Sequence, residues 1–265
     1  MTMLPPVSAP IPTVNKWARP LTTSDPFKWL AQGWQDFRTE MWLSLVYGVI
    51  VLAISIVLVA SLIAFKRDYI LFPVFAGFMV IGPILAVGLY EKSRRIEQGR
   101  PLSLQSMFFV QAASGGQILF TGVLLCLLMM VWIRAAVLIY ALFFGMVAFP
   151  GLDHVASMLF TTPTGWAMLV VGTLVGGLFA SFSFAISAFS IPMLVDQRTD
   201  ALTAMGSSMA LVWNNLGVLL IWAMIVLALF LVSLATGMLG LVVIYPLLGH
   251  ATWHAYRAVR PEVTP

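Results

Sequence analysis

Two aspartates, Asp196 and Asp200, stand four residues apart in SIPMLVDQRTDALTAMGSS, a stretch at 190–208 that interrupts an apolar part of the chain. On one continuous helix they would share a face, as a general acid and a general base would require. The alternative is a turn between two membrane spans, in which Asp196 lies in the turn and Asp200 caps the following helix. The pattern of the whole chain favours the turn.

His250 and His254 are the second set of candidate chemical residues. At positions i and i+4 of one helix they share a face, a spacing that suits a metal ion or a haem. Histidines near a helix C-terminus are also stabilised by the helix dipole, and the neighbouring Trp253 and Tyr256 are typical of a membrane interface. The interfacial interpretation is favoured, and we expect no cofactor and no metal.

Motifs of soluble enzymes are missing from the sequence, which has no GxxxxGK[ST], HExxH, GxSxG or CxxC and only one cysteine, Cys126. The acidic Glu91 and Glu97 lie among basic residues in YEKSRRIEQGR, which indicates a solvated and internally paired cytoplasmic segment. Its basic side chains would face anionic lipid headgroups. These features favour a protein that is not an enzyme.

Composition identifies the bilayer as the main solvent of this chain. Only 9% of the 265 residues are charged, 61% are hydrophobic and the mean hydropathy is +0.99, whereas a soluble domain has about 25% charged residues. The pI near 9.5 does not require a nucleic-acid partner, because Lys and Arg gather in the cytoplasmic loops of membrane proteins.

The apolar runs predict an all-α, polytopic membrane protein with about six transmembrane helices arranged as three hairpins. Eleven of the 14 lysines and arginines fall on one side of these spans and two on the other, so both chain ends are expected in the cytoplasm. The expected spans are 42–65, 69–90, 117–140, 166–186, 216–235 and 238–256.

Arg134 is the one charged residue inside an apolar run, which makes it a functional candidate. It lies roughly 26 Å from the inner end of its span at 1.5 Å per residue, where a long side chain can reach the outer interface. Snorkelling is favoured over a buried contact with an ion or substrate. Residues 135–149 either continue this helix or lie along the outer interface.

An internal repeat is predicted from amphipathic segments that precede each hairpin. Asp25, as N-cap, begins a stripe that returns 175 residues later after Asp200, and a weaker copy begins near 101. The second helix of each hairpin carries a proline: Pro83, Pro192 and Pro246. We therefore expect a disordered, Pro-rich tail at 1–24, one transmembrane domain at 25–258 with repeats at about 25–97, 101–196 and 200–258, and a short tail at 259–265.

The segment 169–190 is rich in small residues. Gly172, Gly176 and Ala180 recur every four residues, which favours close helix packing. The alternative is a polar pathway lined by hydroxyls that otherwise bond to their own helix backbone, those of Ser181, Ser183, Ser187 and Ser190.

Two stretches, GLYEKSRRIEQGRPLSL at 88–104 and FAISAFSIPMLVDQRTDALTAMGSSMALVWNN at 184–215, resemble an uncharacterised bacterial integral membrane family. Its members are loosely labelled putative cytochrome c oxidase subunit I, and the resemblance extends over about residues 25–258. It implies a polytopic inner-membrane protein without an assigned activity. Three histidines are too few for the oxidase core, so the oxidase label is not supported.

Three functions fit these features. The favoured one is a non-enzymatic protein of the bacterial inner membrane that organises or assists other membrane components, with the lipid bilayer and other membrane proteins or further copies of itself as partners. A small transporter or channel is the second, because proline-broken hairpins resemble transporter sites. A lipid-modifying enzyme that uses Asp196 or the histidine pair is the third.

Overall fold

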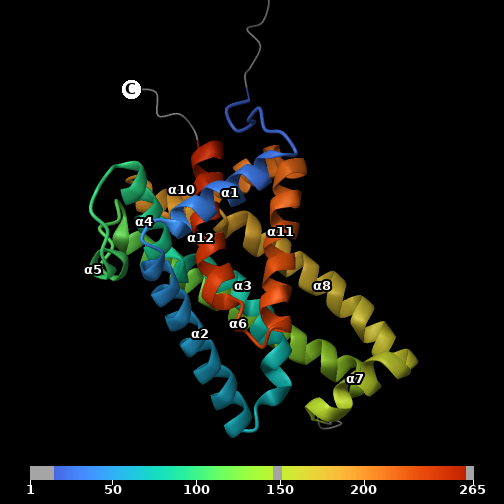
Figure 1. The fold of residues 1–265 in the computed structure, drawn as a ribbon. Coiled ribbons are helices and arrows are strands. Elements are labelled where there is room, and N and C mark those ends of the chain that lie inside the picture. The colour runs from blue at the N-terminus through green and yellow to red at the C-terminus, as the bar shows by residue number, and fades with distance from the viewer. Residues whose placement is uncertain (1–14, 146–150, 261–265) are drawn as a thin grey trace, which may run out of the picture.

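The computed structural model describes residues 15–145 and 151–260, and these residues form helices joined by short connections, with no strand among them (Figure 1). In chain order the helices are α1 (Asp25–Arg38), α2 (Met41–Ala64), η1 (Asp68–Ile70), α3 (Leu71–Leu85), α4 (Val87–Glu97), α5 (Leu104–Phe108), α6 (Gly115–Phe144), α7 (Leu152–Thr161), α8 (Pro163–Ser187), α9 (Ser190–Asp196), α10 (Ala201–Asn214), α11 (Leu216–Ala235) and α12 (Leu241–Val259).

Within the described residues, five segments are long and apolar enough to cross a membrane, and they confirm an all-α membrane protein. They are Met41–Ala64, Asp68–Glu97, Gly115–Phe144, Pro163–Asp196 and Leu216–Ala235. The sixth expected span falls in α12, which is not among the five. Its second half, HATWHAYR, is polar, and this helix is buried by protein instead of by lipid.

α12 is the centre of the bundle, and α1 lies across it in Figure 1. Glycines allow the close contacts. A Cβ on Gly33 of α1 would stand 2.6 Å from the backbone nitrogen of Ala251, and a Cβ on Gly48 of α2 would collide with the carbonyl oxygen of Val242. Pro246 has no N–H to donate to the Val242 carbonyl, so this carbonyl is left without its usual helix partner where Gly48 of α2 approaches it. We call the end of the bundle that carries α1, α4 and residues 15 and 260 the polar end.

The second helices of the first two hairpins are broken, as the prolines predicted, and neighbouring hydroxyls satisfy the freed backbone. The first break lies at Ala86, three residues after Pro83, and there the Tyr47 hydroxyl donates to the carbonyl of Leu85 at 2.6 Å. The Tyr245 hydroxyl donates to the Gly82 carbonyl at 2.8 Å. The Tyr47 bond satisfies a carbonyl at the break, and an unmet carbonyl inside a membrane is costly. The Gly82 carbonyl also accepts from the Ala86 N–H at 3.1 Å, so the Tyr245 bond is an additional link between α12 and the end of α3.

The second break separates α8 from α9 on the N-terminal side of Pro192. The Ser208 hydroxyl of α10 donates to the Ala185 carbonyl at 2.7 Å and accepts from the Phe189 N–H at 3.1 Å. Pro192 itself cannot donate to the Ala188 carbonyl, so the helix ends there. One serine from a third helix therefore holds both sides of this break.

The amphipathic helices α1 and α10 form where the stripes predicted them, but both pack on protein mainly through other faces. In α10, Ala204 and Ser208 are buried, whereas Leu202 and Met209 of the stripe are exposed. In α1, Trp29, Gly33 and Phe37 are buried against the bundle, whereas Phe27 and Trp34 are exposed. The N-cap of α1 is Ser24, one residue before the expected Asp25, which bonds to Lys28 in the first turn.

Residues 15–24, in the segment expected to be a disordered tail, pack on the bundle. Asn215 accepts a hydrogen bond from the backbone N–H of Arg19 at 2.8 Å and donates to the Trp17 carbonyl at 2.8 Å. The Arg19 guanidinium donates to the Val259 carbonyl at 3.1 Å, at the C-terminal end of α12. Residues 1–14 and 261–265 of the two expected tails lie outside the described residues.

Candidate functional site

The segment expected to be solvated around Glu91 is buried. Glu91 and Lys92 are fully buried, and Arg94 and Arg95 are nearly so, because α1, α5, α9 and α12 surround α4. The internal pairing was predicted correctly: Glu91 forms ion pairs with Arg94 at 2.5 Å and Arg95 at 2.6 Å. Arg94 also donates to the Val195 carbonyl at 2.6 Å, where a cation stabilises the last turn of α9. The basic side chains therefore hold helices together and do not face lipid headgroups.

Lys92 begins a buried hydrogen-bonded chain at the polar end. Its ammonium donates to the carbonyls of Asp36 at 3.1 Å and Glu40 at 3.4 Å, and to the Ser44 hydroxyl at 2.7 Å. An ammonium can only donate, so the Ser44 oxygen accepts this bond and its own hydrogen is free for His250 Nε2, 3.0 Å away. Lys92 thus joins the end of α1 to α2 and α12.

His250 is fully buried, and both of its ring nitrogens are engaged. With Nε2 accepting from Ser44, the proton lies on Nδ1, which donates to the Ser93 hydroxyl at 2.9 Å. His254 instead bonds through Nε2 to the Asp36 carboxylate at 2.9 Å. The two histidines therefore serve different partners and do not converge on a ligand. Among the described residues no group of three or more His, Cys, Asp or Glu is placed to hold a metal ion.

A serine beside both a lysine and a histidine, as Ser44 is, resembles an activated nucleophile. Ser44 is fully buried, however. Neither Ser44 nor its partners Lys92 and His250 line the intramembrane cavity that is described below. A substrate has no access to this serine in the structure, and the contacts around it are those of a structural network.

Asp196 and Asp200 have separate partners, as the turn predicted. Asp196 ends α9, where it accepts from the Tyr256 hydroxyl at 2.9 Å and pairs with Arg260 at 2.7 Å. Asp200 caps α10 by accepting from the Thr203 N–H at 2.9 Å. Hydrogen bonds from the side chain and the backbone of Thr203 hold the pKa of Asp200 below its usual value. The two carboxylates do not act as one pair.

Arg134 is exposed on α6, which continues to Phe144. Thirty residues give α6 a length of about 45 Å, which exceeds the roughly 30 Å of membrane hydrocarbon. Residues 135–144 therefore continue the helix, and 146–149 lie outside the described residues. Arg134 does not line the large cavity.

A cavity of about 520 Å³ lies inside the membrane-spanning part of the bundle, between α3, α8, α11 and α12. This volume is within the range of roughly 300–1,000 Å³ that small-molecule sites occupy. Its lining extends along the second span from Phe75 to Tyr90, about 22 Å at 1.5 Å per residue. No charged residue of the described chain lines it. The cavity can hold a long apolar molecule.

The cavity opens toward the bilayer between α8 and α11. These two helices line it but are not among the closely packed helix pairs, and their far ends lie apart in Figure 1. Leu227 and Leu231 of α11 line the cavity and are also 37% and 53% exposed, which places them at its mouth. α10 packs against both helices and holds them together at the polar end.

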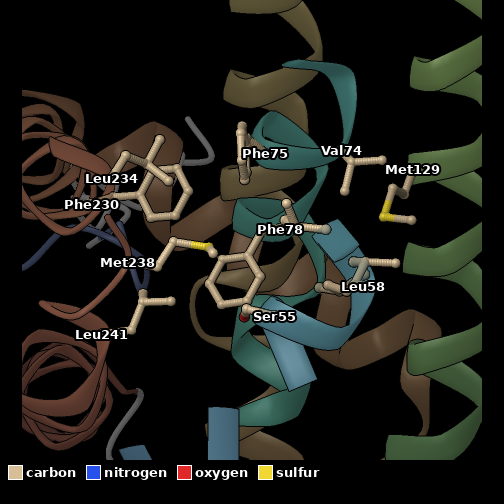
Figure 2. Close-up of a pocket in the computed structure, with 12 residues that line it drawn as sticks. Ser55, Leu58, Val74, Phe75, Phe78, Met129, Phe230, Leu234, Met238 and Leu241 are labelled. Atoms are coloured by element: carbon tan, nitrogen blue, oxygen red, sulfur yellow. The ribbon is translucent and has the colours of Figure 1, made fainter. Parts of the chain in front are cut away.

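A smaller pocket of about 50 Å³ adjoins the cavity and is shown in Figure 2. Phe78 stands between the two spaces and stacks on Phe230, with ring centroids 5.7 Å apart. Ser55 is the single hydroxyl residue of this pocket and donates to its own helix at the Val51 carbonyl. The smaller pocket extends the apolar surface and offers no polar anchor.

Small residues of α8 leave space for the cavity. The sequence analysis expected these residues to pack closely against another helix and did not predict a cavity there. Gly176 does contact α6, since a Cβ there would lie 3.0 Å from the Trp132 ring. Gly177 and Ala180 line the cavity, and a Cβ on Gly177 would meet nothing within 4 Å. The same holds at Gly172, which does not line the cavity.

Among the predicted pathway serines, Ser183 bonds to its own helix at the Phe179 carbonyl. Ser181 is exposed, and Ser190 is buried beyond the cavity lining. Ser187 lines the cavity together with Tyr90, which the sequence analysis did not single out. The available signal for Tyr90 was its place at the last apolar position before YEKSRR.

These features define a polytopic helical membrane protein with an intramembrane cavity and a buried polar end. Residues 71–196, which include the cavity-lining helices α3, α4, α6 and α8, match the model of a family described as predicted integral membrane protein (DUF2189). The match agrees with the resemblance to an integral membrane family noted from the sequence, and the family description names no activity. No curated protein and no solved structure matches the chain.

Proposed function

We propose that this integral membrane protein binds a lipid chain in its cavity and acts without catalysis, as an organising or accessory component of the membrane. The cavity is the observation that carries the proposal. It is apolar, extends over most of the hydrocarbon thickness and opens to the bilayer at Leu227 and Leu231. The mouth lies in the hydrocarbon region of the bilayer, where lipid acyl chains surround the protein. This position favours a lipid over a water-soluble ligand.

The two other functions have weaker support. Transporters use helix breaks to leave backbone carbonyls for ions, whereas here Tyr47, Tyr245 and Ser208 take up backbone groups at the breaks. An enzyme needs a substrate beside its reactive groups, whereas the buried Ser44 lies away from the cavity. We also place both chain ends on the cytoplasmic side of a bacterial inner membrane, supported by the distribution of Lys and Arg.

Lipid retention after purification tests this function. The protein is purified in mild detergent, and the lipid that remains bound is extracted and identified by mass spectrometry. Gly177→Leu fills the cavity, because the new side chain enters space that holds no protein atom within 4 Å of its Cβ. The matched control is Gly172→Leu, on the same helix with equally free space but outside the cavity.

We expect the wild type and Gly172→Leu to retain lipid and Gly177→Leu to lose most of it. Equal retention by all three proteins, or no retained lipid in the wild type, would contradict lipid binding in the cavity.

The organising role has a separate test, in-membrane cross-linking from the exposed faces of α1 and α10. Probes at Phe27, Trp34 and Trp213 lie on surfaces that the protein itself leaves uncovered. A reproducible partner or a second copy is the expected product. A protein that stays monomeric and uncross-linked under several conditions would remove this role.

A further inference from the structure

Most hydroxyls that line the cavity already have partners in the protein. Ser183 and Thr252 donate to carbonyls of their own helices at 2.7 Å, as Ser233 does at 3.0 Å, and Tyr245 donates to the carbonyl of Gly82. Such a hydroxyl is satisfied whether or not a ligand is present. These four groups therefore give no information about what the cavity holds.

Tyr90 and Ser187 differ from this set. Each is only 2% exposed, each lines the cavity, and neither side-chain hydroxyl forms a hydrogen bond within the described part of the chain. A buried hydroxyl without a partner is unfavourable. Since both residues border the same space, a molecule in that space can supply the missing partner.

The position of these hydroxyls restricts the ligand. Tyr90 lies in the first turn of α4, just after the first helix break at Ala86. Ser187 is the last residue of α8, directly before the second break at Ala188. Ala86 and Ala188 also line the cavity. This is the cavity end nearest the polar end, since Tyr90 directly precedes Glu91. In a bilayer, this is the depth at which the apolar chains of a lipid join its polar part.

The chemistry of the lining selects a neutral oxygen acceptor. A tyrosine and a serine hydroxyl can both donate, and no charged residue among the described ones lines the cavity to balance a carboxylate or a phosphate. The ligand therefore carries an uncharged oxygen at this end, an apolar chain beyond it, and any charged group outside the cavity.

We infer that the cavity holds an ester-linked acyl lipid whose carbonyl oxygen accepts hydrogen bonds from Tyr90 and Ser187. This inference rests on the proposed lipid binding and specifies the chemical class of the lipid. The acyl chain follows the apolar lining away from the carbonyl, toward the mouth between α8 and α11, and the charged headgroup stays outside the cavity at the polar end.

The test compares dioleoylphosphatidylcholine with its ether-linked analogue, which has the same chains and headgroup but no carbonyl. Binding of each to the delipidated full-length protein is measured in detergent by native mass spectrometry. Tyr90→Phe and Ser187→Ala remove the two donors, and Ser183→Ala is the matched control, because its hydroxyl is already bonded within α8.

We expect the wild type and Ser183→Ala to bind the ester lipid more tightly than the ether lipid, by about five- to tenfold for each hydrogen bond. Each of the other two variants should lose its share of this preference and keep its affinity for the ether lipid. As a second measurement, the infrared carbonyl band of a ¹³C-labelled ester should shift to lower wavenumber on binding to the wild type, and less in the variants.

Equal affinity of the wild type for the two lipids, with no carbonyl shift, would overturn the ester inference. If that equal binding is still abolished by Gly177→Leu, the proposed lipid site stands without it. If the wild type binds neither lipid, both the proposed function and this inference are wrong.

Discussion

The polar end and the cavity solve the problem of polar groups in a membrane in different ways. At the polar end Glu91, Arg94 and Arg95 are buried, and the charges compensate one another within the protein. Beside the cavity, Tyr90 and Ser187 are equally buried, but their hydroxyls have no hydrogen-bond partner among residues 15–145 and 151–260. In the first region the opposite charges pair within the protein, although Arg94 Nε has no hydrogen-bond partner among the described residues. In the second region we infer that a ligand supplies the partner.

The largest predicted effect is at Glu91, whose removal leaves two nearly buried guanidinium groups uncompensated. We expect Glu91→Ala to lower the free energy of unfolding by about 3–5 kcal/mol. The measurement is unfolding in mixed micelles with increasing SDS. A loss below about 1 kcal/mol, the value typical of a surface ion pair, would show that this end is not a closed network.

Close packing around α12 gives the next effect. Gly33→Ala places a methyl group against the backbone of Ala251, so α1 and α12 must separate, at about 1–3 kcal/mol. The control is Gly206→Ala in α10, where a Cβ meets nothing within 4 Å, and there we expect a gain of up to about 1 kcal/mol from helix propensity. The same SDS titration measures both variants, and equal effects would contradict the close contact.

A loss of similar size is expected where α8 ends beside the cavity. Ser208→Ala removes the donor to the Ala185 carbonyl and the acceptor of the Phe189 N–H, which costs about 1–3 kcal/mol. Ser207→Ala is the matched neighbour, which has no hydrogen bond of its side chain among the described residues. Hydrogen exchange at Phe189 should quicken in the first variant alone; unchanged exchange would show that the serine does not hold the break.

The smallest predicted effect is the loss of the Asp200 cap of α10 at low pH. The lowered pKa of Asp200 means that its cap stabilises the helix above the usual carboxyl pKa of 3.8 and is lost as the pH falls through the lowered value. Hydrogen exchange of the Thr203 N–H should therefore quicken only in strongly acidic solution. Asp200→Ala should show the faster exchange already at neutral pH. An unaltered rate in that variant would contradict the cap.

The sequence predicted five of the six expected spans, two breaks at prolines and the Asp200 cap, because proline chemistry and apolar periodicity act locally. The third proline, Pro246, does not break α12, which is continuous. The sequence did not predict that α4 is buried, because a segment as charged as YEKSRR is typical of a solvated loop, and three of the four helices that cover it come from distant parts of the chain.

The interfacial interpretation of the histidine pair was wrong for His250, Trp253 and Tyr256, which are fully buried. The hydrogen-bond partners of the two histidines, Ser44, Ser93 and Asp36, lie 157 to 218 residues away in the sequence.

The cavity was beyond sequence reasoning for a similar reason. Small residues on α8 predict close packing when a neighbour approaches and empty space when it does not, and only the placement of α11 decides between these outcomes. The three-repeat organisation stays a prediction, and so do the two tails beyond the described residues.

Photolabelling in native membranes tests lipid occupancy of the cavity most directly, with a phospholipid that carries a diazirine in the middle of its acyl chain. We predict saturable labelling of the cavity lining on α8 and α11, near Ala180 and Leu231, that is lost in Gly177→Leu and retained in Gly172→Leu. Labelling spread evenly over exposed apolar residues such as Val57 of α2, and unchanged by Gly177→Leu, would contradict it.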